Sequence, residues 1–347
     1  MRTSIRPNDP SIFDYQNRLE LLATRDKSAL DRLNEIMEWT IFRADLKKPF
    51  EKEAKAPGGR PAYDMLLMFK ILVLQRLFNL SEEQTEFQIL DRFSFQRFLG
   101  LTVADRVPDK NTIWLFKETL IQGDVFERLF ARMWKYLETR GIRLGEGKIV
   151  DSSFIEVPRN RNSPDDNASL KQGEIPKDWD EEKLSHKDVD ARWTKKGDEN
   201  HYGYKAHIKA DAKTKLVEAV VVTPASTHDS QMVDDLIDQN DGIWYGDGAY
   251  HNQAIHEQLS EAGVTDRTCE VGRRNRPLNE RQRQRNRSRS RIRSRVEHIF
   301  GIMTVSMDAF EQRCHGLVRN TATSVFAFTV YNMLRLSLLK PKRVAVT

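Results

Sequence analysis

Eight arginines occupy every second position from Arg281 to Arg295, and this run restricts what the chain can form there. In a strand, one face would be all arginine and the other mostly polar, so neither face could be buried in a sheet. A helix suits the later part better, because five apolar residues fall on one stripe at helical spacing: Ile292, Val296, Ile299, Phe300 and Met303. The sequence therefore predicts a helix there, with Glu297 at the margin of the apolar stripe.

The charge of this segment is unusually concentrated. Between Val271 and Arg295 there are eleven arginines and one acid, Glu280, a local net charge of +10 against +5 for the whole chain. Helical stacking of Arg281, Arg285, Arg289 and Arg293 costs about 0.2–0.5 kcal/mol for each like-charged pair. A polyanion would remove that repulsion. We therefore predict a basic arm at 271–295 that becomes ordered on phosphates and leads into the helix that carries Glu297.

The length of 347 residues suggests two domains, or one large domain with an appendage. Two cysteines, Cys269 and Cys314, provide no disulfide framework and no metal-ligand spacing, which suits a reducing cytosol. The N-terminus has no apolar signal region. The most apolar stretches, 65–80 and 324–339, are too short and too polar to span a bilayer and are predicted to be buried helices. The prediction is a cytoplasmic protein.

Residues 1–140 read as helical. Three helix starts are marked by a proline, a capping box and a group of capping residues: Pro61, Ser81 with Gln84, and Asp109 with Asn111 and Thr112. The first helix is expected to run to about Asn79 and the third to about Leu120. Two helices around a tight turn are typical of a DNA-reading helix-turn-helix and equally of an ordinary helical hairpin.

After Gly141 the pattern changes to strands alternating with helices, which predicts a layered α/β domain. The expected strands are 147–157, 201–211, 215–226, 242–250 and 264–271, with a turn at Lys213 and Thr214 between the second and third. Helices are expected from Asp229, as the cap, to about Ile237 and over 251–263. The charged, proline-containing stretch 158–200 looks like a long mobile insertion without packed elements.

Three acids stand out near the ends of these elements. Asp151 follows an apolar pair in the first strand, Asp247 closes GIWYGD between two glycines, and Glu297 borders the arginines. Together they would form an oxygen-only site for hard divalent cations, and two such ions can drive an in-line displacement at phosphorus. Each acid also has a plain structural explanation: a turn cap, an Asp-Gly turn and an ion pair with Arg293.

Several motifs together resemble the bacterial insertion-sequence DDE transposases of the insertion sequence 5 family. The motifs are GGRPAYDMLLMFKILVLQ near the N-terminus, VDSSFIEV, HYGYKAHIKAD, VTPASTHDS, WYGDGAY and RVEHIFG. The resemblance implies an α/β fold: a ribonuclease-H-like catalytic domain, a mixed sheet with flanking helices, at 141–347, preceded by an all-α domain at 1–140 for DNA-end binding or dimerisation.

The resemblance also implies a mechanism. Asp151, Asp247 and Glu297 would hold two Mg²⁺ ions, with Mn²⁺ able to substitute, and water would cut a strand at the element's end. The freed 3′-OH would then attack target DNA, with no covalent protein–DNA intermediate. The implied partners are double-stranded DNA, as terminal inverted repeats and target, and a second copy of the chain. The implied location is the nucleoid in the bacterial cytoplasm.

Six further residues are candidates for contacts with DNA: Arg293, Arg289, Arg285, Arg295, Lys205 and His207. Lys205 and His207 are equally well explained as surface residues on the second strand. The family pattern Tyr-x2-Arg-x3-Glu-x6-Lys is matched by Arg293 and Glu297, but Ser290 and Thr304 replace the Tyr and the Lys.

Three alternatives remain at this point. A metal-dependent nuclease would use the same acids without strand transfer or end-specific binding. A DNA-binding derivative would retain the fold without catalysis, although the presence of all three acids argues against it. The arginine run could also be an RNA-binding arm.

Overall fold

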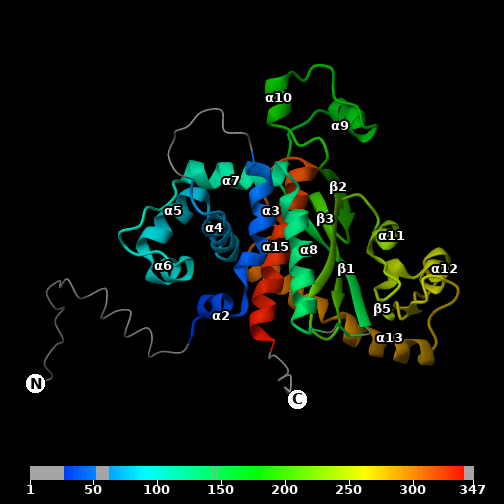
Figure 1. Ribbon diagram of the computed structural model, residues 1–347. Helices are drawn as coiled ribbons and strands as arrows, with labels where there is room; N and C mark the ends of the chain where they lie inside the picture. The colour runs from blue at the N-terminus through cyan, green and yellow to red at the C-terminus, as the bar shows by residue number, and fades with distance from the viewer. Residues whose placement is uncertain (1–26, 52–61, 143, 146, 340–347) are drawn as a thin grey trace, which may run out of the picture.

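The computed structural model describes residues 27–51, 62–142, 144–145 and 147–339. Its centre is a six-stranded mixed sheet (Figure 1). The strands are β1 (Gly147–Glu156), β2 (Arg192–Lys196), β3 (Glu199–Asp211), β4 (Val217–Pro224), β5 (Ile243–Tyr245) and β6 (Thr265–Asp266). They lie in the order β2-β3-β1-β5-β6, and β4 also pairs with β3. The strand β3 is antiparallel to its three partners, whereas β5 runs parallel to β1 and β6 parallel to β5.

The predicted strands are confirmed, with shorter limits at 242–250 and 264–271. The β3–β4 turn is stabilised by Asp211, whose Oδ1 accepts hydrogen bonds from Lys213 N at 3.1 Å and from Thr214 Oγ1 at 2.7 Å. The mixed sheet with flanking helices and a preceding helical region agrees with the predicted ribonuclease-H-like class.

The N-terminal region is helical in every regular element that the structure describes. These elements are α2 (Ala29–Ile36), η1 (Trp39–Phe42), α3 (Arg43–Lys47), η2 (Lys48–Phe50), α4 (Met65–Leu77), α5 (Glu82–Asp91), α6 (Phe93–Leu99), α7 (Lys110–Gln122) and α8 (Val125–Thr139). The capping box of Ser81 and Gln84 begins α5, and Asp109 Oδ1 accepts from Thr112 N at 2.7 Å to begin α7. Pro61, expected to open α4, lies outside the described residues; the cap of α4 is Asp64.

Helices cover both faces of the sheet (Figure 1). One face packs Val150, Trp244 and Tyr250 against α11 (Val233–Leu236) and α12 (Gln253–Glu261). The other face packs against α8, α14 (Val296–Gly301) and the long α15 (Leu317–Leu338). The apolar stripe predicted around Glu297 belongs to this second face, because Val296, Ile299 and Met303 are buried there.

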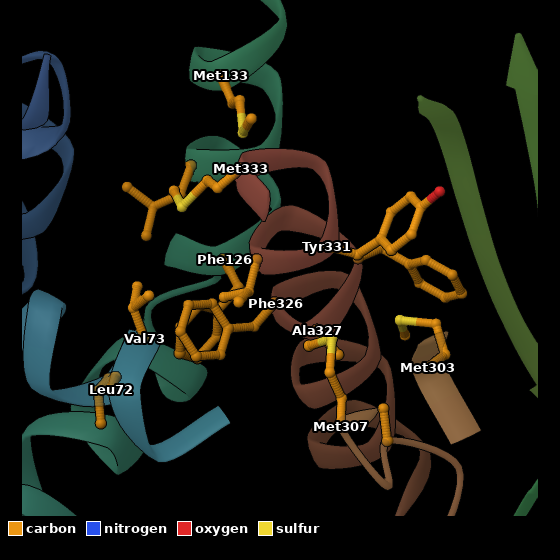
Figure 2. Close-up of a cluster of buried hydrophobic side chains, with 14 of the residues drawn as sticks. Leu72, Val73, Phe126, Met133, Met303, Met307, Phe326, Ala327, Tyr331 and Met333 are labelled. Atoms are coloured by element: carbon orange, nitrogen blue, oxygen red, sulfur yellow. The ribbon is translucent and has the colours of Figure 1, made fainter. Parts of the chain in front are cut away.

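The helix α15 joins the N-terminal helices to the sheet in one continuous core. Figure 2 shows Phe326 of α15 beside Phe126 of α8, and their ring centroids are 4.7 Å apart. On the other side of α15, Met303 and Met307 lie below Tyr331 (Figure 2). Both apolar stretches, 65–80 and 324–339, form mostly buried helices as predicted, and none of the described helices is long and apolar enough to span a membrane.

The insertion at 158–200 is more ordered than predicted. It contains α9 (Pro164–Lys171), α10 (Glu181–Ser185) and β2. The buried Asp188 ties it to the body: its Oδ1 accepts from Tyr204 Oη at 2.6 Å and its Oδ2 from Gly316 N at 3.0 Å. The prediction of an insertion without packed elements was therefore wrong, because backbone pairing and one buried carboxylate hold it where apolar residues are few.

Candidate active site

Asp151 lies in β1, and Asp247 follows β5, the adjacent parallel strand. In the β1–β5 pair, Ile149 lies opposite Tyr245. Continuing this register two residues past the end of β5 brings Asp247 beside Asp151, on the same side of the sheet. That side is the one on which Ile149 and Tyr245 pack against the core shared with α15. The two acids are close enough for the charge of Asp247 to raise the pKa of Asp151.

The carboxyl of Asp151 is poorly compensated. Its side chain is 15% exposed, and burial raises its pKa from 3.8 to about 6. Two hydrogen bonds oppose this shift: Ser152 N donates to Oδ1 at 2.9 Å, and Arg293 Nη1 donates to Oδ2 at 2.7 Å. Since the pKa stays raised despite these donors, the pair of acids has an unmet preference for positive charge, which a divalent cation would satisfy.

Asp247 is fixed by the turn that follows it. Its Oδ1 accepts from Ala249 N at 2.9 Å and so caps η4 (Gly248–Tyr250). The flanking glycines allow close packing within the protein. A Cβ on Gly248 would lie 2.6 Å from Val271 Cγ2, and one on Gly246 would lie 3.0 Å from Tyr250 Cδ2. The close approach at these glycines is therefore to the protein's own side chains.

Glu297 lies apart from the two aspartates. It is exposed on α14, and among the described residues it does not form a group with Asp151 and Asp247 whose donor atoms all lie within 4.8 Å of one another. A tight turn precedes it, in which Arg295 N bonds to Ile292 O and Glu297 N to Ser294 O. Such bonds overwind a helix and rotate the residues that follow. The π-helical turn η5 (Ile302–Ser306), which contains Thr304, follows α14.

The arginine run forms the helix α13 (Glu280–Arg293), which begins with a capping box of Asn279 and Gln282. The arm predicted to need phosphates for order is therefore helical in the protein alone. The reason lies one residue before the basic arm at 271–295: Glu270 accepts from Arg285 Nε at 2.9 Å and lies 3.5 Å from Arg289 Nη1. This carboxylate offsets part of the repulsion between the stacked guanidinium groups.

All four arginines predicted to contact DNA make contacts within the protein. Arg285 pairs with Glu270, Arg293 with Asp151, Arg289 Nη1 donates to Thr268 O at 2.6 Å, and Arg295 Nη1 donates to Ala212 O at 2.8 Å. Four other arginines of α13 are exposed and have no ion-pair partner among the described residues: Arg281, Arg283, Arg287 and Arg291. Three of these, at i, i+4 and i+8, form one outward stripe along the helix.

Lys205 and His207 are drawn into the protein rather than presented to solvent. Lys205 Nζ donates to Thr227 O at 2.8 Å and to Asp229 Oδ1 at 3.1 Å. His207 is fully buried, and its Nε2 lies 2.9 Å from Thr223 Oγ1. A direct contact between His207 and DNA does not fit this burial. The predicted cap role of Asp229 was also wrong, since the η3 turn (Asp229–Met232) is capped by the side chain of His228.

Tyr250 is a site residue that the sequence did not single out. It is fully buried, and its hydroxyl has no hydrogen-bond partner among the described residues. Burial first, and then the charges of Asp229, Asp151 and Asp247, raise its pKa well above the ordinary value. The hydroxyl therefore stays protonated at ordinary pH. Its position three residues after Asp247 was the signal in the sequence.

Comparison with known protein families agrees with this geometry. Residues 143–333 match the family described as Transposase DDE domain, and residues 17–119 match a second family, Transposase domain (DUF772). No solved structure matches the chain. The first match covers more than half of the chain and includes all three acids. The chain therefore belongs to the Transposase DDE domain family and is a DNA transposase.

Proposed function

We propose that this transposase binds the terminal inverted repeats of an insertion sequence, cuts a phosphodiester bond at each end and joins the 3′-OH to target DNA. Within the wider family, we infer from its motifs that it resembles the insertion sequence 5 group. The observation that carries the proposal is the pair of Asp151 and Asp247, two carboxylates on adjacent strands whose charge Arg293 offsets only in part.

Asp151, Asp247 and Glu297 are the residues that would hold two Mg²⁺ ions, with Mn²⁺ able to replace them. The fit rests on the donor set, which is all oxygen, and on the raised pKa of Asp151, which marks a carboxylate that gains from a nearby cation. The ions would supply an activated water and stabilisation of the leaving oxygen.

The residues of the chain then have distinct tasks. Asp247 is held by its hydrogen bond to Ala249 N, so its free oxygen has a fixed direction. Arg293 neutralises Asp151 in the protein alone. Once a cation takes over that charge, the guanidinium is free to donate to a phosphate beside the bond that is cut. Glu297 joins the aspartates when the overwound turn before α14 relaxes towards regular helix, which rotates its side chain.

DNA binding has two components in this proposal. The outward arginines of α13, together with Arg285, Arg289 and Arg295, contact phosphates without sequence preference. The N-terminal helices around the turn between α4 and α5 read the inverted repeat. Cutting two ends together calls for a dimer or a larger assembly on DNA. The protein would act at the bacterial nucleoid.

A cleavage and strand-transfer assay on labelled element-end DNA with Mg²⁺ tests the proposal. The variants are Asp247→Asn, which keeps the cap of η4, and Glu297→Gln, which keeps the size of the side chain. The matched controls are the exposed Asp235→Asn on α11 and Glu280→Gln on α13. We expect wild type and both controls to cut and join, and the two site variants to bind DNA without cutting.

Other outcomes would select the alternatives. Nicking of any DNA without joining would favour a metal-dependent nuclease. Binding without cutting by the wild type would indicate a derivative that has lost catalysis. Full activity of Glu297→Gln would remove Glu297 from the site and leave the third ligand to another residue.

A further inference from the structure

A second cluster of ligand-type side chains lies outside the acid pair. His251 follows η4, His256 lies in the first half of α12, and Asp266 ends β6. Each offers one donor atom such that all three atoms lie within 4.8 Å of one another. Among the described residues, this is the one group of three such side chains that is as close as that.

The cluster is arranged around one carboxylate oxygen, Asp266 Oδ2. Asp266 Oδ1 accepts from Thr268 N at 2.6 Å, whereas its buried Oδ2 accepts no hydrogen bond within the described part of the chain. His256 Nδ1 lies against that same Oδ2 as an ion-pair partner. The ring of His251 stands edge-on to that of His256, with centroids 4.7 Å apart.

One ring nitrogen of His251 remains for a ligand. Its Nδ1 lies 3.2 Å from Thr268 Oγ1, which orients the ring and leaves Nε2 without a hydrogen bond among the described residues. Metal-bound histidines commonly use their second nitrogen in this way.

The charges around the cluster are close to balanced. Arg289 and Glu270 act on His251 from the side of α13. Arg289 lies 3.5 Å from Glu270. The carboxylate of Glu270 therefore offsets much of the repulsion that Arg289 would exert on a cation at the histidines. Asp266 supplies the one negative charge within the cluster itself. The surroundings therefore do not exclude a cation.

We propose that His251, His256 and Asp266 bind one zinc-type transition-metal ion, at a site separate from Asp151 and Asp247. Two imidazoles and one carboxylate suit Zn²⁺ or a similar ion, whereas the all-oxygen acid pair suits Mg²⁺. The ion would fasten the loop after Asp247 to α12 and β6. It would thereby hold the segment that positions Asp247.

The test is a titration of the untagged, full-length, metal-stripped protein with Zn²⁺ against a chromophoric chelator, in excess Mg²⁺. We expect one tight site per chain in the wild type. His256→Gln and His251→Gln should each weaken it about 100-fold or more, because losing even an indirect partner of a metal costs 10–100-fold. The exposed His186→Gln on the far insertion is the matched control and should bind as the wild type does.

Three results would overturn the inference. One is that the wild type and the double variant His251→Gln/His256→Gln have the same affinity for Zn²⁺. Another is a His256→Gln variant with unchanged affinity. The third is loss of the site in Asp247→Asn, which would place the ion at the acid pair. Circular dichroism of each metal-free variant shows whether it is folded. If His256→Gln is unfolded, the test relies on His251→Gln, whose substitution lies in a loop. The result of the zinc titration does not depend on the result of the cleavage assay.

Discussion

The guanidinium of Arg293 donates a 2.7 Å hydrogen bond to the carboxylate of Asp151, which lies 142 positions earlier in the chain. This contact joins the arginine helix α13 to β1 in the middle of the sheet. The arginine-rich helix and a buried, partly compensated acid therefore influence each other directly. A change in the charge of Asp151 alters the interactions of Arg293, and the reverse also holds.

Asp151→Asn should stabilise the metal-free protein near neutral pH. The folded-state pKa of Asp151, about 6, lies above the ordinary 3.8, so ionisation above about pH 6 costs the folded state free energy. We expect the free energy of unfolding near pH 7 to rise by roughly 1–3 kcal/mol. The gain should vanish as the pH falls towards about 4, where the folded wild type has the acid protonated. Urea unfolding in EDTA measures both values.

The control for this prediction is Asp235→Asn, which changes an exposed carboxylate on α11. Its free energy of unfolding should stay within about 0.5 kcal/mol of the wild type at both pH values. A loss of stability in Asp151→Asn at neutral pH would mean that the bond to Arg293 outweighs burial.

Glu270→Gln should loosen α13 and strengthen non-specific DNA binding. The hydrogen bond from Arg285 holds the pKa of Glu270 below its usual 4.5, so its stabilising effect is present above that pH and is lost on further acidification. Without the charge, Arg285 and Arg289 lose their shared partner. Hydrogen exchange of residues 280–293 should accelerate, and affinity for random duplex DNA should rise. Glu280→Gln, at the exposed start of the helix, should do neither; unchanged exchange in Glu270→Gln would contradict the role of Glu270.

Removing the outward stripe should reduce the salt dependence of DNA binding. The triple variant Arg283→Gln/Arg287→Gln/Arg291→Gln removes three unpaired charges that face solvent. If each meets one phosphate, the slope of log Kobs against log salt should decrease by up to ~2.7. The double variant Arg285→Gln/Arg289→Gln should change the slope less per charge, because Glu270 already engages both. Equal slopes in wild type and triple variant would place the DNA elsewhere.

Phe326→Ala should destabilise the N-terminal helices and the sheet together. Phe326 is 6% exposed and packs on Phe126 and on Phe69, with ring centroids 4.7 and 6.0 Å apart. Its truncation should cost about 3–5 kcal/mol, and near- and far-ultraviolet signals should report one shared transition. Val318→Ala, exposed on the same helix, should change little. Two separate transitions in the variant would show that the two regions are independent.

Local signals in the sequence predicted much of the fold. Ser81 with Gln84 and Asp109 begin helices as their patterns indicate, and the apolar β-branched run around Ile149 forms the central strand. Asp151 and Asp247 were predicted as site residues because an unpaired acid in an apolar context is costly, and their roles stay predictions.

What the sequence could not provide depended on distant partners. The strand β2, RWTKK, is too polar to stand out, and it forms because it pairs with the extended start of β3. Glu270 lies directly before the basic arm at 271–295 and outside the arginine run itself. Its effect on α13 therefore becomes visible only once the chain is folded. The cluster of His251, His256 and Asp266 has no familiar metal-ligand spacing in the sequence. Asp266 belongs to a different element, β6, and lies beside the histidines only in the folded chain.

The position of α15 has a consequence for the synthesis of this protein. The helix follows every strand in the chain, yet its residues fill the space between the N-terminal helices and the sheet. The N-terminal part of the chain leaves the ribosome first. The apolar surfaces of α8 and β4 that pack on α15 therefore stay exposed to solvent until α15 has been synthesised. An unfinished polypeptide would therefore expose apolar surface and be a client for chaperones and proteases.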